Sequence, residues 1–273
     1  MTTAEHGVLY LAQGEGYLQQ AIVSVRSLRQ QMPGIAVTLH TNDVARARRE
    51  CPPDVDIRQS KEFWTREEKI DVFLDSPFEK TVFLDTDTYV CADLSDLFVL
   101  LDRFEMAVAH APGRDRYGET TCPPCFPEMN SGVVAYRKTP GVCAVLERWR
   151  ELYGEWMQRD HKPPGDQPPL RQAVYESGIQ FCVLPPEYNF RAIVPAFAGE
   201  GMQVKIVHSH HSDLEQLAQW LNASREARVF LPGLPFFAPK SFAFLSGSAR
   251  RLTRILFRLQ SIAIKLTGSK TSR

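Results

Sequence analysis

The sequence predicts an α/β domain with a mostly parallel central sheet, followed by a C-terminal basic amphipathic helix. Three observations lead to this prediction. Short apolar runs alternate with segments of helical periodicity over residues 1–225, a proline-rich stretch then interrupts the pattern, and residues 249–273 combine an apolar face with a basic one. We therefore divide the chain into a domain (1–225), a Pro-rich connector (226–248) and a basic tail (249–273).

The domain begins with a strand, a helix and a second strand. Gly7 to Ala12 is an apolar run, Gln19 to Gln31 carries apolar residues at helical spacing, and Ala36 to Leu39 is a second apolar run. Such a unit pairs its two strands in parallel through a right-handed crossover.

The next unit leads into a central strand. Thr65 to Glu68 has the pattern of a capping box, in which the Thr and Glu side chains bond amides of the first helical turn. The helix ends at Ser76-Pro77, because proline does not continue it. Thr81 to Leu84 is a continuous apolar run, which is typical of a strand buried on both faces.

The remaining elements follow the same alternation. Between two of them lies Pro112 to Glu128, a long irregular stretch with Arg114, Arg116 and Tyr117, which we expect to be a functional loop. The expected strands are Met106 to Ala109, Gly132 to Tyr136, Gln180 to Leu184 and Val204 to Val207, and the expected helices run from Pro140 to about Met157 and from Leu170 to Glu176.

Composition excludes two classes of protein. With 44% hydrophobic residues and 32 basic against 32 acidic residues, the chain is neither disordered nor a general nucleic-acid binder. The charge is unevenly spread, however. Eight of the basic residues and none of the acidic ones lie between Lys240 and Arg273, so residues 1–239 carry a net charge of −8 and the remainder +8.

The tail has the pattern of a helix that lies on an anionic membrane surface. The alternative is a helix packed on the acidic surface of the domain itself. Its apolar face would be formed by Leu252, Ile255, Leu256, Leu259, Ala263 and Leu266, and its basic face by Arg251, Arg254, Arg258 and Lys265.

The chain shows neither a secretory signal pattern at its start nor an apolar run long enough to span a bilayer. Six cysteines are sparse for this length, so we expect reduced thiols and a cytoplasmic protein, peripheral at the cytoplasmic membrane face if the tail binds lipid. Cys122 and Cys125 have the spacing of a zinc or redox pair, but no second such pair completes four ligands.

The sharpest chemical signal is Asp85-Thr86-Asp87, directly after the buried strand. Ligands bind at the carboxyl ends of strands in α/β sheets, and paired carboxylates suit a hard divalent cation such as Mg²⁺ or Mn²⁺. Such a cation would bridge a diphosphate. The structural alternative is a turn in which the Asp side chains cap neighbouring amides.

Two enzyme classes use this motif. In haloacid dehalogenase-like phosphatases the motif sits on the first strand and is followed by a later pair of acids. Here it follows a complete strand–helix–strand unit, and Gly165-Asp166 lacks the second acid. The position therefore favours the second class, the metal-dependent glycosyltransferases that use nucleotide sugars. A third interpretation is a non-catalytic nucleotide-sugar or membrane-surface binding module.

From Val8 to about His208 the sequence resembles glycosyltransferase family 8. The resemblance rests on several motifs in the same order as in the family, and it implies the glycosyltransferase A fold, which is Rossmann-like. The motifs are Tyr17, Lys69, Asp85-Thr86-Asp87, Ala92 to Phe98, Asn130-Ser131-Gly132-Val133, Gly165-Asp166-Gln167, Leu184 to Asn189, and Val204 to His208.

The resemblance implies a hexosyltransferase-like enzyme with a UDP-sugar as donor, an acceptor hydroxyl on a glycan, lipid or protein, and retention of configuration. It implies Asp85, Asp87 and His208 as ligands of Mn²⁺ or Mg²⁺, and Asp166, Asn130 and Lys69 as the residues at the reacting sugar. It also implies a set of donor-binding residues, which are Leu11, Gln13, Tyr17, Lys69, Asp85, Thr86, Asp87, Asn130, Ser131, Gly132, Asp166 and Gln167. Because the Pro112 to Glu128 loop lies between the metal motif and the Asn130 segment, we expect it to cover the acceptor site.

The sequence departs from the family after His208. Family members often continue with a Gly and a Lys-Pro-Trp, whose Lys contacts the leaving diphosphate. Here the chain reads Ser209-His210-His211, without a lysine, so His211 is the expected substitute contact.

Overall fold

The computed structural model describes residues 5–61, 66–113, 121–159 and 165–231. Several expectations fall outside these ranges: the Thr65 cap, the basic residues Arg114 and Arg116 of the expected loop, most of the connector and the whole tail. In the described ranges no helix is both long and apolar enough to cross a bilayer. All six cysteines lie within them, and none forms a disulfide.

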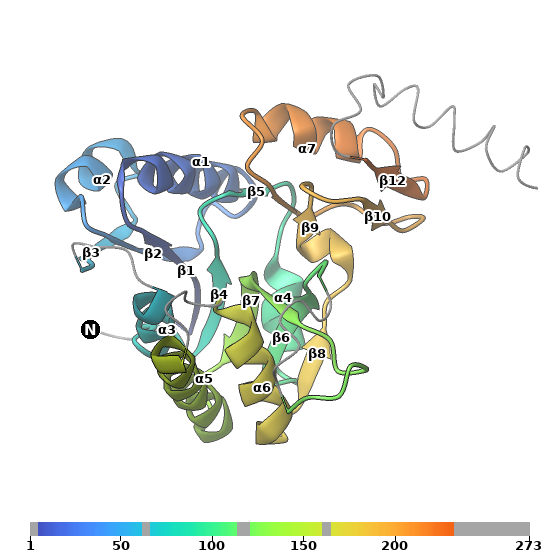
Figure 1. Cartoon of the computed structure of the whole chain (residues 1–273). Helices are drawn as coiled ribbons and strands as arrows, with labels where there is room; N and C mark the ends of the chain where they lie inside the picture. The colour runs from blue at the N-terminus through green and yellow to red at the C-terminus, as the bar shows by residue number, and fades with distance from the viewer. Residues whose placement is uncertain (1–4, 62–65, 114–120, 160–164, 232–273) are drawn as a thin grey trace, which may run out of the picture.

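A seven-stranded sheet runs through the middle of the domain in the order β3-β2-β1-β4-β7-β6-β8 (Figure 1). Neighbouring strands pair in parallel except at β7, which runs antiparallel to β4 and β6. The predicted mostly parallel sheet is therefore confirmed. Its strands are β1 (His6–Ala12), β2 (Ala36–Thr41), β3 (Asp56–Gln59), β4 (Lys80–Leu84), β6 (Met106–His110), β7 (Met129–Arg137) and β8 (Phe181–Val183).

Helices cover both faces of this sheet, as the alternation of β1 requires. Val8 and Tyr10 pack in one core with α1, and Leu9 and Leu11 pack in a second core with α3, α5 and α6. Figure 1 shows α1 and α2 on one side of the sheet and α3, α5 and α6 on the other. The helices are α1 (Glu15–Gln31), α2 (Val44–Glu50), α3 (Arg66–Leu74), α4 (Ser95–Leu100), α5 (Pro140–Arg159), α6 (Gln167–Ser177) and α7 (Leu214–Asn222).

Two small sheets lie beyond the carboxyl end of β4. One has the order β5-β11-β9, with β5 (Thr88–Val90), β9 (Phe190–Arg191) and β11 (Ile206–His208). The other pairs β10 (Ala196–Ala198) with β12 (Arg228–Phe230), so regular structure continues past residue 225. Phe190 and Val207 pack with α7 in a third core, which joins the small sheets to this helix.

Two helices begin earlier than the sequence pattern predicts. α1 begins at Glu15 rather than Gln19, so Tyr17 lies in its first turn instead of before it. α6 begins at Gln167 rather than Leu170, with Pro168 and Pro169 in the first turn, where their missing amide protons cost nothing. Both shifts move predicted binding residues onto helix N-termini.

Candidate active site

The site is centred on the turn Asp85–Asp87, which connects β4 to β5. Val82, Phe83 and Leu84 are fully buried, so the turn starts at a fixed point in the core. The Asp85 amide donates to the Gly132 carbonyl (2.8 Å), and the Thr88 hydroxyl donates to the Asp85 carbonyl (2.7 Å). The backbone of the turn is thereby held at both ends.

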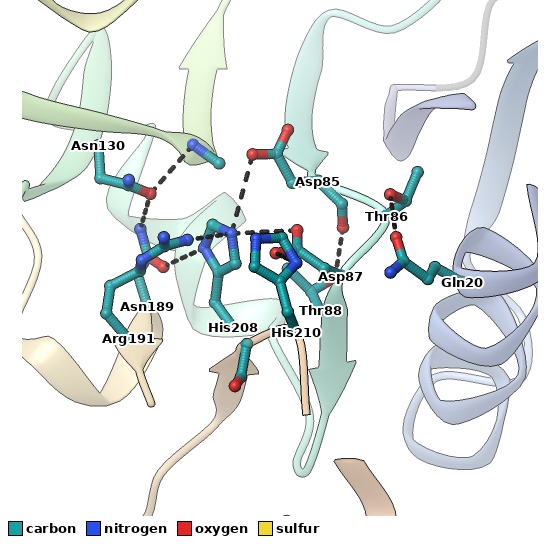
Figure 2. Close-up of polar contacts among 12 residues, drawn as sticks. Gln20, Asp85, Thr86, Asp87, Thr88, Asn130, Asn189, Arg191, His208 and His210 are labelled. Atoms are coloured by element: carbon teal, nitrogen blue, oxygen red, sulfur yellow. Dashed lines mark hydrogen bonds and ion pairs between the residues drawn. The ribbon is translucent and has the colours of Figure 1, made fainter. Parts of the chain in front are cut away.

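The small sheet brings His208 to this turn. His208 on β11 is the register partner of Thr88 on β5 and of Arg191 on β9. Its Nε2 lies 3.2 Å from an Asp87 carboxylate oxygen and 3.8 Å from an Asp85 carboxylate oxygen (Figure 2). One ligand atom from each of Asp85, Asp87 and His208 lies within 4.8 Å of the others, the sole His/Cys/Asp/Glu group of this kind among the described residues.

Hydrogen bonds fix the orientation of the His208 ring. Its Nδ1 lies 2.8 Å from the Asn189 side-chain oxygen, and the Asn189 amide group donates to the side-chain oxygen of Asn130 (2.7 Å). Nδ1 therefore carries the proton, and Nε2 presents its lone pair toward the two carboxylates. A hydrogen bond of this kind is the usual support for a metal-binding histidine.

Asp87 is ionised in this setting. Although burial raises its pKa, the neighbouring His208 and His210 imidazoles and the Arg191 guanidinium hold that pKa well below its usual range. The site thus offers two carboxylate oxygens and, in the neutral form of the His208 ring, one imidazole nitrogen. This donor set fits Mn²⁺ or Mg²⁺, and the residues are those predicted from the sequence.

A second polar cluster lies beside the first. The buried Lys69 ammonium is 2.9 Å from an Asp85 oxygen, 3.3 Å from an Asp166 oxygen and 3.1 Å from the Ser131 hydroxyl, which itself donates to Asp166 (2.6 Å). Burial disfavours both charges, but the ion pairs outweigh it, so the pKa of Lys69 is raised and that of Asp166 lowered. Lys69 therefore links the Asp85–Asp87 turn to the N-terminus of α6.

These groups line one cavity of about 300 Å³, here called the first cavity. It brings together eleven of the predicted site residues with four others. The predicted ones are Leu11, Tyr17, Lys69, Asp85, Thr86, Asp87, Asn130, Ser131, Asp166, Gln167 and His208, and the additional ones are Arg66, Phe83, Arg191 and His210.

Three predicted residues do not line the first cavity. Gln13 is buried beneath it, where its amide group donates to the Lys61 carbonyl (2.8 Å) and to a Glu68 oxygen (2.6 Å). Gly132 lies behind His208 and Asp85. A Cβ at this position would stand 2.1 Å from Cε1 of His208, so only glycine lets β7 approach so closely.

His211 is the third. It is exposed, and its Nδ1 accepts from the Asp213 amide (3.1 Å), so the structure does not bring it to the cavity. Its neighbour His210 is there instead, with Nδ1 3.2 Å from an Asp87 oxygen. Side chains two residues apart on an extended chain point the same way. Counting from His208 therefore predicts that His210, rather than His211, faces the cavity.

A second cavity, of about 570 Å³, adjoins the first. The two share Asn130, Gln167 and Arg191. Its other walls come from both ends of the expected loop Pro112 to Glu128 and from the segment after β9, and they are formed by Ala111, Pro112, Gly113, Glu128, Ile193, Val194 and Pro195.

Comparisons with known proteins agree with this geometry. No family model matches the chain. Glycogenin-1 of Oryctolagus cuniculus is 31% identical over 139 residues, which are 48% of this chain and 35% of glycogenin-1. The chain therefore matches about a third of the length of that relative.

Among solved structures, an active-site mutant of LgtC shares the fold: 15% identity, a TM-score of 0.51, and coverage of 89% of this chain and 95% of LgtC. The glycosyltransferase GlyE of Streptococcus pneumoniae TIGR4 aligns over 68% of this chain and 47% of its own, with 21% identity and a TM-score of 0.47. The predicted glycosyltransferase A-type fold is confirmed, and so is the resemblance to family 8, which includes glycogenin.

Proposed function

We propose that this protein is a metal-dependent glycosyltransferase that moves a sugar from a nucleotide-diphosphate donor to an acceptor hydroxyl with retention of configuration. The donor is a UDP-sugar. One observation carries the proposal: Asp85, Asp87 and His208, predicted from sequence as ligands, converge on one cavity at the carboxyl end of a central strand. The similarity to glycogenin-1 and the fold shared with LgtC support it.

Different residues of the first cavity bind the metal ion and the base of the donor. Asp85, Asp87 and His208 hold the divalent cation, Mn²⁺ or Mg²⁺, which when bound neutralises the charge that develops on the leaving diphosphate. Tyr17 is half exposed in the first turn of α1 at the cavity and offers a ring for the uracil base to stack on.

The sugar lies deeper, against the second polar cluster. Asp166 and Gln167 at the start of α6 bind its hydroxyls, together with Asn130 and Ser131 at the start of β7. Lys69 keeps Asp166 ionised and in place, so that its carboxylate balances positive charge on the reacting sugar. Thr86, whose hydroxyl donates to Gln20 (3.2 Å), positions the turn against α1.

The acceptor enters through the second cavity. It meets the first cavity at Asn130, Gln167 and Arg191, and the first two of these are among the proposed sugar-binding residues. This arrangement supports the expectation that the Pro112 to Glu128 segment borders the acceptor site.

Neither rival function is favoured. A phosphatase of the haloacid dehalogenase type needs an aspartyl nucleophile with access to the phosphate. Here the Asp85 carboxylate forms an ion pair with Lys69, and the Asp87 carboxylate contacts the imidazoles of His208 and His210. A non-catalytic module would not require the buried ion pair between Lys69 and Asp166 at the sugar position.

The test is a binding and product assay with Asp87→Asn. The wild-type chain should bind UDP only with Mn²⁺ present and transfer a sugar from one of a panel of UDP-sugars to an acceptor. Asp87→Asn should lose both properties with its fold intact, whereas His211→Ala, changed outside the cavity, should keep them. Unchanged metal-dependent UDP binding in Asp87→Asn would refute the proposal.

We propose in addition that the tail (249–273) holds the enzyme on an anionic membrane surface, where lipid-linked acceptors would be within reach. The support is the sequence pattern alone: eight basic and no acidic residues between Lys240 and Arg273. The full chain should sediment with vesicles containing anionic phospholipid, and a chain ending at residue 248 should not. Equal sedimentation of both would refute membrane binding through the tail.

A further inference from the structure

The first cavity must accommodate several negative charges when a donor binds. Three carboxylates, Asp85, Asp87 and Asp166, line it, and a donor of the proposed kind brings a diphosphate as well. Lys69 is committed to two of the carboxylates. Beyond the metal ion, some cation of the protein must therefore face the phosphates.

Arg191 is placed for this task. It is the register partner of His208, so its side chain emerges from the same face of the small sheet as the metal-binding histidine. Figure 2 shows its guanidinium reaching over to the His208 ring, with Asp87 beyond. It lines both the first and the second cavity, so it lies where the donor and the acceptor would meet.

The bonding of Arg191 is incomplete. Its Nη1 hydrogen-bonds Nε2 of His208, and its Nε is buried without a hydrogen-bond partner among the described residues. Such an orphaned donor is costly to bury. A phosphate oxygen is the partner that the paired N–H groups of a guanidinium fit best.

Under the proposed function, the contact between Arg191 and His208 breaks when the metal binds. Because Nδ1 of His208 is bonded to Asn189, its ring has one lone pair left, on Nε2. A guanidinium and a divalent cation cannot both use that lone pair. When His208 acts as a metal ligand, Arg191 must give up Nε2 and turn its N–H groups elsewhere in the cavity.

We propose that Arg191 is a diphosphate-binding residue of this site, and that its guanidinium moves from His208 to the phosphates when the metal and the donor bind. The inference rests on the proposed function. The segment after His208, Ser209 to Asp213, contains no lysine or arginine that could serve instead. Arg191 thus bonds Nε2 of His208 before the metal binds, and it balances phosphate charge once the metal and the donor are bound.

The exchange of partners predicts opposite effects of one substitution on two ligands. In Arg191→Ala, UDP at saturating Mn²⁺ should bind about 10- to 100-fold more weakly, because a charge-assisted hydrogen bond to phosphate is lost. Mn²⁺ alone should bind about tenfold more tightly, since its competitor for Nε2 has gone. Calorimetry measures the first affinity, and electron paramagnetic resonance of Mn²⁺ the second.

Two further variants complete the test. Arg191→Lys keeps the charge without the paired N–H groups and should lie between wild type and Arg191→Ala in UDP affinity. Arg58→Ala, which removes an arginine on β3 that pairs with Asp56 outside both cavities, should change neither affinity. This control separates the local effect from a change in net charge.

The possible outcomes are distinct. An arginine that merely supported the His208 ring would give weaker Mn²⁺ binding in Arg191→Ala, and this result or an unchanged UDP affinity would overturn the inference. Absence of metal-dependent UDP binding in the wild-type chain would instead refute the proposed function. The lysine variant carries the test if Arg191→Ala does not fold.

Discussion

Replacing Gly132 with alanine should disable the metal site without removing any chemical group from it. The added Cβ would lie 2.1 Å from Cε1 of His208 and 2.6 Å from an Asp85 carboxylate oxygen, whereas ordinary contacts of a Cβ lie at 3.4–4 Å. The His208 ring must therefore move by about 1.3 Å. Metal–ligand distances tolerate changes of about 0.2 Å, so the three ligands can no longer share one ion.

Two measurements follow from this geometry. Mn²⁺-dependent UDP binding, measured by calorimetry, should fall at least about 100-fold, the usual effect of a displacement of about 1 Å at a site. The free energy of unfolding, measured with urea, should fall by about 1–3 kcal/mol, the usual cost of overpacking a filled core.

The control is Gly154→Ala on α5. No atom lies within 4 Å of a Cβ at Gly154, so this variant should gain about 0.5–1 kcal/mol of stability from helix propensity and bind UDP as wild type does. Wild-type UDP affinity in Gly132→Ala would refute the reasoning, because it would mean that His208 and Asp85 are not held against this glycine.

Two other changes probe the supports of the site. Asn189→Ala removes the partner of His208 Nδ1 and should weaken Mn²⁺ binding about 10- to 100-fold. It should also lower the free energy of unfolding by about 1–3 kcal/mol, because buried polar groups lose a partner, and an unchanged Mn²⁺ affinity would contradict the role of Asn189 in fixing the ring. Asp166→Asn should lower the free energy of unfolding at pH 7 by about 3 kcal/mol by breaking a buried ion pair. Because the folded-state pKa of Asp166 lies below its ordinary value of 3.8, the ion pair stabilises the fold above that pH and is lost as pH falls through the folded pKa. The variant's stability should therefore depend less on pH in the acid range, and parallel wild-type and variant curves would contradict this assignment.

The large elements and the candidate metal-binding turn could be predicted because each carries a strong local signal. β4 is a continuous apolar run, and Asp85 and Asp87 follow it at the only end of the strand where ligands bind in such folds. α2 and β3 were missed since their sequences, VARARRE and DIRQ, contain few apolar residues. Of the small-sheet strands, β11 was expected from the run Val204 to Val207, whereas the other strands of these sheets are two or three residues long, too short to show an alternation.

Arg191 and His210 could not be identified by motif, since neither belongs to one of the family's sequence patterns. Arg191 reaches the site because a two-residue strand, β9, pairs with β11, and this pairing is a tertiary contact. The expectation for His211 depended on which of two adjacent histidines faces the turn, and a step of one residue along an extended chain reverses that direction.

The small sheet β5-β11-β9 also has a consequence for folding. Thr88 and His208 pair although more than a hundred residues separate them along the chain, so their contact carries a large loop-closure entropy. During synthesis the two aspartates emerge long before the histidine that completes their site. Under the proposed function, affinity for the divalent cation is therefore acquired only with the last strand of this sheet, and the metal can serve as a probe that distinguishes the finished fold from a chain in which only the central sheet has formed.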